Sequence, residues 1–174
     1  MNTKNKTLAL IAAAITFGSV AMPAFADASE KKPPATRKVK VSYTKVVDPT
    51  KTVFGPQVCD ASGRCSILVA GPGAVTGSLT GTEVSTISGI AAGADVYSTS
   101  ITSFTGTVEG CGTGAYISRA TVDVIGGVSP PVEWEIIPGT GTGDLVGITG
   151  RGTTTGSSDF ITYVSEGTIR CARR

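Results

Sequence analysis

The acidic residues Glu133 and Glu135 are the first candidates for chemistry in this chain. Two residues that are two apart on a strand point to one side, and glycoside hydrolysis requires two carboxyl groups several ångströms apart. Trp134 lies between them, and its apolar neighbours favour the interior. We therefore expect both glutamates to face solvent, and the catalytic residues of the chain stay unknown.

The absence of histidine removes most other catalytic options. It excludes a Ser-His or Cys-His nucleophile, a His-ligated metal and the side chain that most often transfers protons near neutral pH. The glycine run at residues 139–143 matches neither a dinucleotide-binding fingerprint nor a P-loop, and it indicates a hairpin turn. Asp144 and Asp159 lie at strand ends but form no ligand-spaced acidic loop. We expect no cofactor and no metal, and a role other than catalysis is favoured.

The first 26 residues have the pattern of a secretory signal peptide. A basic head with Lys4 and Lys6 precedes an apolar run at residues 8–22, and Ala24-Phe25-Ala26 forms an A-x-A cleavage site. The apolar run is short for a membrane span, which needs about 20 residues. The pattern predicts a signal peptide at residues 1–26 and a secreted, periplasmic or otherwise extracytoplasmic protein without an integral membrane segment after cleavage.

Residues 27–40 are basic and poor in apolar side chains. They contain Pro33-Pro34 and no aromatic residue, a composition typical of a disordered leader. Contact of this leader with anionic lipid or cell-wall polymer is the alternative. The rest of the mature chain is mildly acidic, and it lacks the basic residues interleaved with aromatic ones that nucleic-acid binding favours. We expect no nucleic-acid partner.

Residues 41–174 are predicted to form one all-β domain. Threonine, valine, isoleucine, serine and glycine dominate this part, and no capped segment has the apolar spacing of an amphipathic helix. Turn residues separate nine expected strands, at residues 39–47, 52–58, 65–70, 75–90, 96–108, 113–125, 132–137, 145–150 and 159–171. Such strands suit a sandwich or an up-and-down barrel, and closure into a barrel removes exposed edges. We therefore predict a single antiparallel up-and-down β-barrel of about eight strands.

Alternation within the later strands predicts which side chains are buried. In the strand at residues 113–125, Tyr116 shares one face with small and apolar residues, while charged and polar residues occupy the other. Trp134 and its apolar neighbours define the inner face of the strand at residues 132–137. Phe104 lies on the corresponding face of the strand before Cys111. These three aromatic residues are expected inside the domain.

Four runs of residues resemble a known family, namely FTGTVEG at 104–110, GTGAYI at 112–117, WEIIPGTGTGDLVG at 134–147 and GRG at 150–152. They are similar to an uncharacterised bacterial family assigned to the allene oxide cyclase-like barrels, which is also the fold of plant dirigent proteins. The resemblance spans residues 75–156, and its most specific part is W-x-x-x-P-G-[ST]-G-T-G-[DE]-L. It implies an eight-stranded, calycin-like barrel with a central cavity, and it implies neither an established activity nor a catalytic set.

Four cysteines in an exported chain predict two disulfides, for which three pairings are possible. An up-and-down strand order places the turns alternately at two ends, with those near residues 60–63, 93, 126 and 156 at one end and those near residues 49, 71, 110 and 139 at the other. Cys59 and Cys65 flank a turn at the first end, whereas Cys111 and Cys171 share the second. We therefore predict the pairs Cys59–Cys65 and Cys111–Cys171. A zinc site is disfavoured because no C-x-x-C spacing is present.

The sequence leaves three functions open. The favoured one is binding of a small apolar or amphipathic molecule inside the barrel, against Trp134, Tyr116, Phe104 and Phe160. The second is a filled barrel with a structural or interaction role at the cell envelope. The third, implied by the resemblance, is an isomerase or cyclase of the allene oxide cyclase type. Binding is preferred because small side chains on the inner faces leave room in the lumen.

Overall fold

Runs rich in threonine, valine and serine form the strands of this protein, as expected from the preference of branched side chains for extended backbone. The structure is a computed structural model that describes residues 35–157 and 161–173. Its elements are β1 (Thr36–Val47), β2 (Val53–Phe54), β3 (Arg64–Gly77), β4 (Leu79–Ala92), β5 (Asp95–Val108), β6 (Gly112–Val124), β7 (Val132–Ile136), the 3-10 helix η1 (Gly143–Leu145), β8 (Thr149–Gly156) and β9 (Thr162–Ala172).

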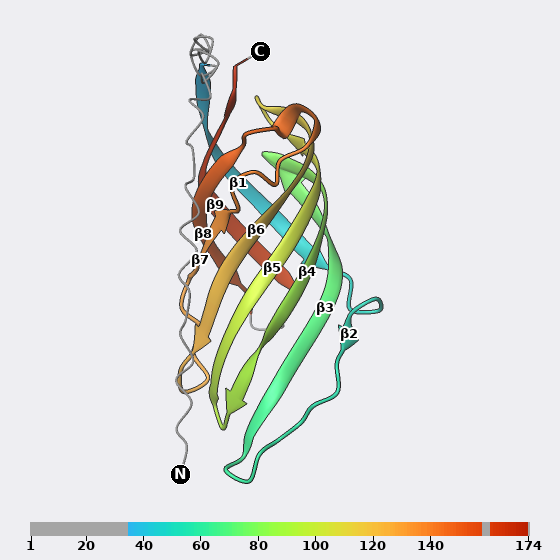
Figure 1. Cartoon of the computed structure of the whole chain (residues 1–174), viewed down its shortest axis with the longest axis vertical. Coiled ribbons are helices and arrows are strands. Elements are labelled where there is room, and N and C mark those ends of the chain that lie inside the picture. Colours follow the sequence, from blue (N-terminus) through green and yellow to red (C-terminus); the bar gives the residue numbers. More distant parts are fainter. Residues whose placement is uncertain (1–34, 158–160, 174) are drawn as a thin grey trace, which may run out of the picture. The chain divides into compact units, whose positions relative to one another are not determined.

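The strands form one antiparallel sheet in the order β1-β9-β8-β7-β6-β5-β4-β3-β2. An additional pairing of β1 with β3 closes this sheet into a barrel of eight strands (Figure 1). The two-residue strand β2 lies beside β3, where Val53 and Phe54 pair with Ala70 and Val69. The predicted all-β, up-and-down barrel is confirmed.

The predicted turn at residues 71–73 is wrong. Strand β3 continues through these residues, and the hairpin turn falls at Ser78. Glycine is needed here for close approach rather than for turning, because a Cβ atom at Gly73 would lie 2.9 Å from Cε of Lys45. The single strand expected at residues 75–90 is consequently two strands.

Three further strand boundaries differ from the prediction. The strand expected at residues 52–58 is reduced to β2, because the rest of that segment forms a connecting loop. In place of the strand at residues 145–150 there is η1, followed by β8, which begins at Thr149. The last strand begins at Thr162 rather than at residue 159, and residues 158–160 lie outside the described part of the chain.

The barrel begins at Thr36, before the expected boundary at residue 41. Residues 36–40 pair with β9, starting with Thr36 opposite Ala172, so this part of the expected leader belongs to the fold. The predicted signal peptide and residues 27–34 lie outside the described residues. In the described ranges, no helix is long and apolar enough to cross a membrane.

Both predicted disulfides, Cys59–Cys65 and Cys111–Cys171, are present. The direction assigned to the first strand was nevertheless reversed, because β1 is antiparallel to β3 and therefore runs in the same direction as β4. The turn wrongly placed at residues 71–73 and the missed hairpin at Ser78 compensate for each other, whereas the strand wrongly assigned before Cys59 reversed the direction of the first strand. Every strand end from the Gly93 turn onward therefore lies where the turn order placed it.

The core occupies the end of the barrel that holds the Cys111–Cys171 disulfide. Phe104, Tyr116 and Trp134 are 0%, 2% and 7% exposed, so the predicted inner faces are confirmed. They belong to one buried cluster with Val41, Tyr43, Val75, Leu79, Val108, Cys111, Ile136, Leu145, Ile148, Ile169 and Cys171. This half of the interior is filled by side chains.

Trp134 packs against backbone rather than against side chains on one side of its ring. Gly152 of β8 and Gly167 of β9 are direct cross-strand partners, and a Cβ atom at either position would lie 2.7 Å from Cζ2 of Trp134. The indole Nε1 donates a hydrogen bond to the carbonyl oxygen of Thr153 at 3.3 Å. The glycine pair thus makes the space in which the largest side chain fits.

Gly167→Ala should lower the free energy of unfolding by about 1–3 kcal/mol, the usual cost of overpacking a core. The added Cβ would lie 2.5 Å from the carbonyl oxygen of Arg151 as well as against the Trp134 ring, and backbone cannot move aside as an exposed side chain can. Denaturant unfolding beside the exposed control Thr155→Ala measures the effect. A Gly167→Ala variant as stable as the wild type would contradict this packing.

The opposite half of the barrel is not closed. Strand β1 pairs only with residues 73–77 of β3, and β7 pairs only with residues 118–120 of β6. Beyond these pairings, residues 64–72, 85–92, 95–102 and 121–124 form a sheet of β3, β4, β5 and β6, here called the open sheet. Strands β3, β4 and β5 extend past the ends of β1 and β9 (Figure 1). Alternate residues on the inner face are apolar and half-buried, namely Ile67, Val69, Ile87, Val96, Val122 and Val124.

Candidate functional site

Two oppositely charged side chains lie inside the barrel. Lys45 of β1 and Glu83 of β4 are only 9% and 5% exposed, and Nζ of Lys45 lies 3.5 Å from Oε2 of Glu83. Successive side chains of a strand point to opposite faces of the sheet, so residues an even number of positions apart share a face. Lys45 is two residues after the buried Tyr43, and Glu83 is four residues after the buried Leu79, so both side chains point inward. The pair lies where the filled half of the interior meets the open sheet.

A series of hydroxyl groups continues from the lysine toward the open sheet. Nζ of Lys45 donates a hydrogen bond to Oγ of Ser85 at 2.5 Å. Oγ of Ser85 lies 2.8 Å from Oγ1 of Thr102, which lies 3.5 Å from Oγ of Ser100. These hydroxyls belong to inward positions of β4 and β5, so the inner end of the open sheet is polar while its outer part is apolar.

A second polar group lies on β1, β8 and β9. The hydroxyl of Ser165 forms hydrogen bonds with Tyr43 and, at 2.6 Å, with Oγ1 of Thr154. Nζ of Lys45 also lies 6.0 Å from the centre of the Tyr163 ring, within the range of a cation–π interaction. In the described residues no buried side-chain nitrogen or oxygen lacks a hydrogen-bond partner.

Burial shifts the pKa of each charged group in the direction that favours its neutral form. Desolvation lowers the pKa of Lys45, and the Glu83 charge opposes this shift. Desolvation likewise raises the pKa of Glu83, against the charge and the hydrogen bond of Lys45. Burial also raises the pKa of Tyr43 and of Tyr116, so both phenols stay protonated. Mutual attraction is therefore what favours the charged forms of Lys45 and Glu83.

The carboxyl group of Glu83 should titrate above its ordinary pKa of 4.5, because desolvation is the largest influence on it. In Lys45→Met the pKa should rise further, since the lysine charge and hydrogen bond both stabilise the carboxylate. Carboxyl ¹³C NMR across an acid titration measures both values. An ordinary pKa for Glu83 in both proteins would contradict its burial in the barrel.

The predicted aromatic residues are brought together beneath this pair. The rings of Phe104 and Tyr116 stack with centroids 4.9 Å apart, and Tyr43 meets Trp134 at 6.5 Å. These rings are packed against each other in the filled half of the interior. Phe160, the fourth predicted contact, lies outside the described residues.

Sequence reasoning missed Lys45 and Glu83 as functional candidates. A signal was present, because Lys45 continues the inward series of Val41 and Tyr43 and a charge on such a face is unusual. Glu133 and Glu135 are exposed, as expected. In the part of the chain that the structure describes, no group of three His, Cys, Asp or Glu side chains could hold a metal ion.

Comparison with protein families matches residues 49–163 to DUF3224, described as a protein family of unknown function. A crystal structure at 1.84 Å of a DUF3224 family protein with unknown function from Shewanella oneidensis MR-1 has a similar fold. The TM-score is 0.61 at 14% identity, over 80% of this chain and 100% of that chain. A comparison with curated proteins finds no significant match. These comparisons do not show the relation to allene oxide cyclase-like barrels that the sequence resemblance implies.

Proposed function

We propose that this chain, which belongs to the DUF3224 family, is an extracytoplasmic binding module for a small amphipathic molecule. The main support is the buried pair of Lys45 and Glu83 at the inner end of the open sheet. Burial of two charges costs solvation energy that their attraction often fails to recover, so apolar side chains would serve stability better. Buried charged groups with shifted pKa values are typical of binding and catalytic sites.

The apolar part of the ligand would lie on the inner face of the open sheet, against Ile67, Ile87 and Val122. Its polar part would reach the Lys45–Glu83 pair, which offers both N–H donors and carboxylate acceptors. Because the two charges balance, a ligand with an uncharged hydroxyl or amide group fits better than an ion does.

The aromatic residues predicted from the sequence have a place in this arrangement. Trp134, Tyr116 and Phe104 would form the floor of the site beneath the ion pair. Phe160 is retained as a proposed contact, although it lies outside the described residues. In this arrangement the aromatic side chains set the depth of the site, while the ion pair selects the polar group of the ligand.

Fluorescence of Trp134, the single tryptophan of the chain, tests this function. Linear primary amides and alcohols of increasing chain length are titrated into the disulfide-bonded protein. We expect a saturable change in emission and an affinity that rises with chain length. In the matched variant Lys45→Met/Glu83→Leu the amide and alcohol series should bind no better than alkanes do. Equal affinity in both proteins, or no saturable change, would contradict the proposal.

The extracytoplasmic location is supported by the two disulfides, since such bonds persist in oxidising compartments. The proposed signal peptide at residues 1–26 would be removed after Ala26. N-terminal sequencing of the exported chain should begin at Asp27. A full-length chain retained in the cytoplasm would contradict this part of the proposal.

A filled barrel with a structural role is the second candidate function. It is favoured by the dense packing of Phe104, Leu79 and Ile169, which have no exposed surface. This function needs no ligand at the open sheet, and it predicts that double replacement of Lys45 and Glu83 leaves the protein fully functional. The fluorescence titration therefore separates the two candidates.

A further inference from the structure

Basic residues from the two ends of the described chain meet at the end of the barrel that holds the Cys111–Cys171 disulfide. The pairing of β1 with β9 places Lys38 opposite Arg170 and Arg37 opposite Cys171. Strand β8 adds a further arginine beside β9. We call this group the basic cluster, and its members are Arg37, Lys38, Lys40, Arg151, Arg170 and Arg173.

The basic cluster differs from the other cations in lacking acidic partners. Every other described lysine or arginine makes an ion pair, namely Lys45 with Glu83, Lys51 with Asp48, Arg64 with Asp60 and Arg119 with Glu135. Within residues 35–157 and 161–173, no member of the basic cluster makes one. Two of these cations, Arg37 and Arg173, line the same pocket, and cations without an ion-pair partner attract anions.

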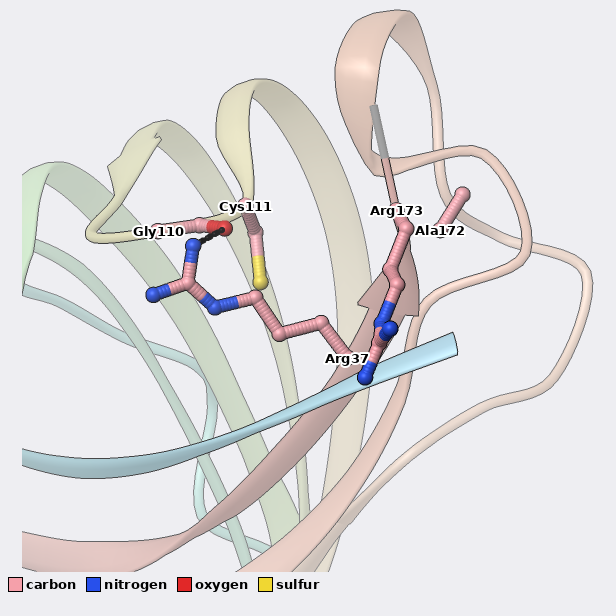
Figure 2. A pocket seen from close by; sticks show the side chains of 5 residues that line it. All are labelled: Arg37, Gly110, Cys111, Ala172 and Arg173. Carbon is pink, nitrogen blue, oxygen red and sulfur yellow. Dashed lines mark hydrogen bonds between the residues drawn. The ribbon is translucent and has the colours of Figure 1, made fainter. Parts of the chain in front are cut away.

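A pocket of about 360 Å³ opens within this region, and Figure 2 shows the two arginine side chains that border it. Its lining residues are Arg37, Gly110, Cys111, Ala172 and Arg173, none of which is acidic. Nη1 of Arg37 donates a hydrogen bond to the carbonyl oxygen of Gly110 at 3.2 Å, which orients the guanidinium group.

The rim of the pocket is fixed by covalent and backbone bonds. The Cys111–Cys171 disulfide ties the turn after β5 to β9, with the two Cα atoms 5.8 Å apart. The backbone N–H of Arg173 donates to the carbonyl oxygen of Ala35 at 2.8 Å. Two guanidinium groups are therefore presented from anchored backbone, so less conformational entropy is lost when an anion binds.

We propose that this pocket binds the phosphate group of a phosphate-bearing ligand. Guanidinium groups present several N–H donors in a plane that matches phosphate oxygens, and only one donor of Arg37 is used by Gly110. The pocket is larger than one phosphate group, so a phosphate ester fits with part of its organic group. Soluble phosphate esters and lipid headgroups share this chemistry. The proposal is independent of ligand binding at the open sheet.

Inorganic phosphate and glycerol phosphate, titrated at constant ionic strength into the disulfide-bonded protein, test the proposal. Arginine Nε–Hε resonances followed by NMR should shift saturably for Arg37 and Arg173 and stay unchanged for Arg64 and Arg119. Arg37→Gln/Arg173→Gln should weaken binding by about tenfold or more, because charge-assisted hydrogen bonds are lost. Arg64→Gln/Arg119→Gln removes the same charge elsewhere and should bind phosphate as the wild type does.

Vesicles of phosphatidylglycerol, compared with phosphatidylcholine, identify the source of the phosphate group. Sedimentation with phosphatidylglycerol that Arg37→Gln/Arg173→Gln abolishes and the control keeps would indicate a lipid headgroup. Shifts with soluble phosphate alone would indicate a soluble ester. Equal weakening in both double variants, or no arginine-dependent binding to any of these probes, would overturn the proposal. Arg173→Gln alone, at an exposed position after β9, provides the same test if the double variant does not fold.

Discussion

Lys45→Met should destabilise the protein by about 3–5 kcal/mol, because it leaves the carboxylate of Glu83 buried without its partner. The double variant Lys45→Met/Glu83→Leu should recover most of this loss. Apolar replacement of a whole buried ion pair is often neutral, or stabilising by about 1–4 kcal/mol. Denaturant unfolding of the disulfide-bonded proteins measures both effects. The matched control is Lys51→Met, which breaks an exposed ion pair and should leave the unfolding midpoint nearly unchanged.

The loss of stability caused by Lys45→Met should also depend on pH. Burial raises the pKa of Glu83 above its unfolded value, so the folded state takes up a proton more readily than the unfolded state does. The contribution of Glu83 to stability is therefore present at low pH and is lost as the pH rises through the folded-state pKa. Acidification should therefore reduce the loss of stability in Lys45→Met, because it neutralises the unpaired carboxylate. A loss of stability independent of pH, or a double variant less stable than Lys45→Met, would contradict a buried ion pair.

Trp134→Ala should cost about 3–5 kcal/mol, the sum of lost transfer energy and the cavity that remains. The ring is 7% exposed and lies against the backbones of Gly152 and Gly167, which cannot move in to fill the space. The exposed Tyr97→Ala on β5 is the control and should change stability far less. Tryptophan emission of the wild type should be blue-shifted. Emission close to that of free tryptophan, with an unchanged unfolding midpoint in Trp134→Ala, would place the ring in solvent.

Alternation made the inner faces of β5, β6 and β7 predictable from sequence. Phe104, Tyr116 and Trp134 stand among small or apolar residues at every second position, and this period exists only in an extended strand with one buried face. Because each strand reverses direction, the same pattern also placed Cys111 and Cys171 at one end. These parts of the fold depend on local periodicity and on counting strands.

Glycine was harder to interpret, because one residue type serves two purposes. At Gly93 a positive φ of 63° allows the turn between β4 and β5, whereas at Gly73 the missing side chain makes room for Lys45. Sequence alone does not distinguish the two uses, and the turn predicted at residues 71–73 failed for this reason. The hairpin at Ser78 contains the turn pair Gly77-Ser78, in which Gly77 has a positive φ of 116°, but the prediction placed the turn at residues 71–73 instead.

The candidate site itself was only half predictable. Its aromatic floor follows from alternation, but Lys45 and Glu83 come from strands that first meet through closure of the barrel and lie 3.5 Å apart only there. The basic cluster is similar, since Lys38 and Arg170 face each other through the pairing of β1 with β9. Charged residues brought together by long-range pairing cannot be recognised from the spacing of residues along the chain.

Native mass spectrometry of the disulfide-bonded protein, purified from its own source, tests ligand binding in the barrel most directly. The wild type should retain a small amphipathic molecule that dissociates on unfolding, and Lys45→Met/Glu83→Leu, folded with the same two disulfides, should retain none. If the wild type shows only the mass of the protein alone, even after incubation with linear amides and alcohols, there is no ligand site at the Lys45–Glu83 pair. Equal retention of ligand by the wild type and the double variant would contradict that site as well.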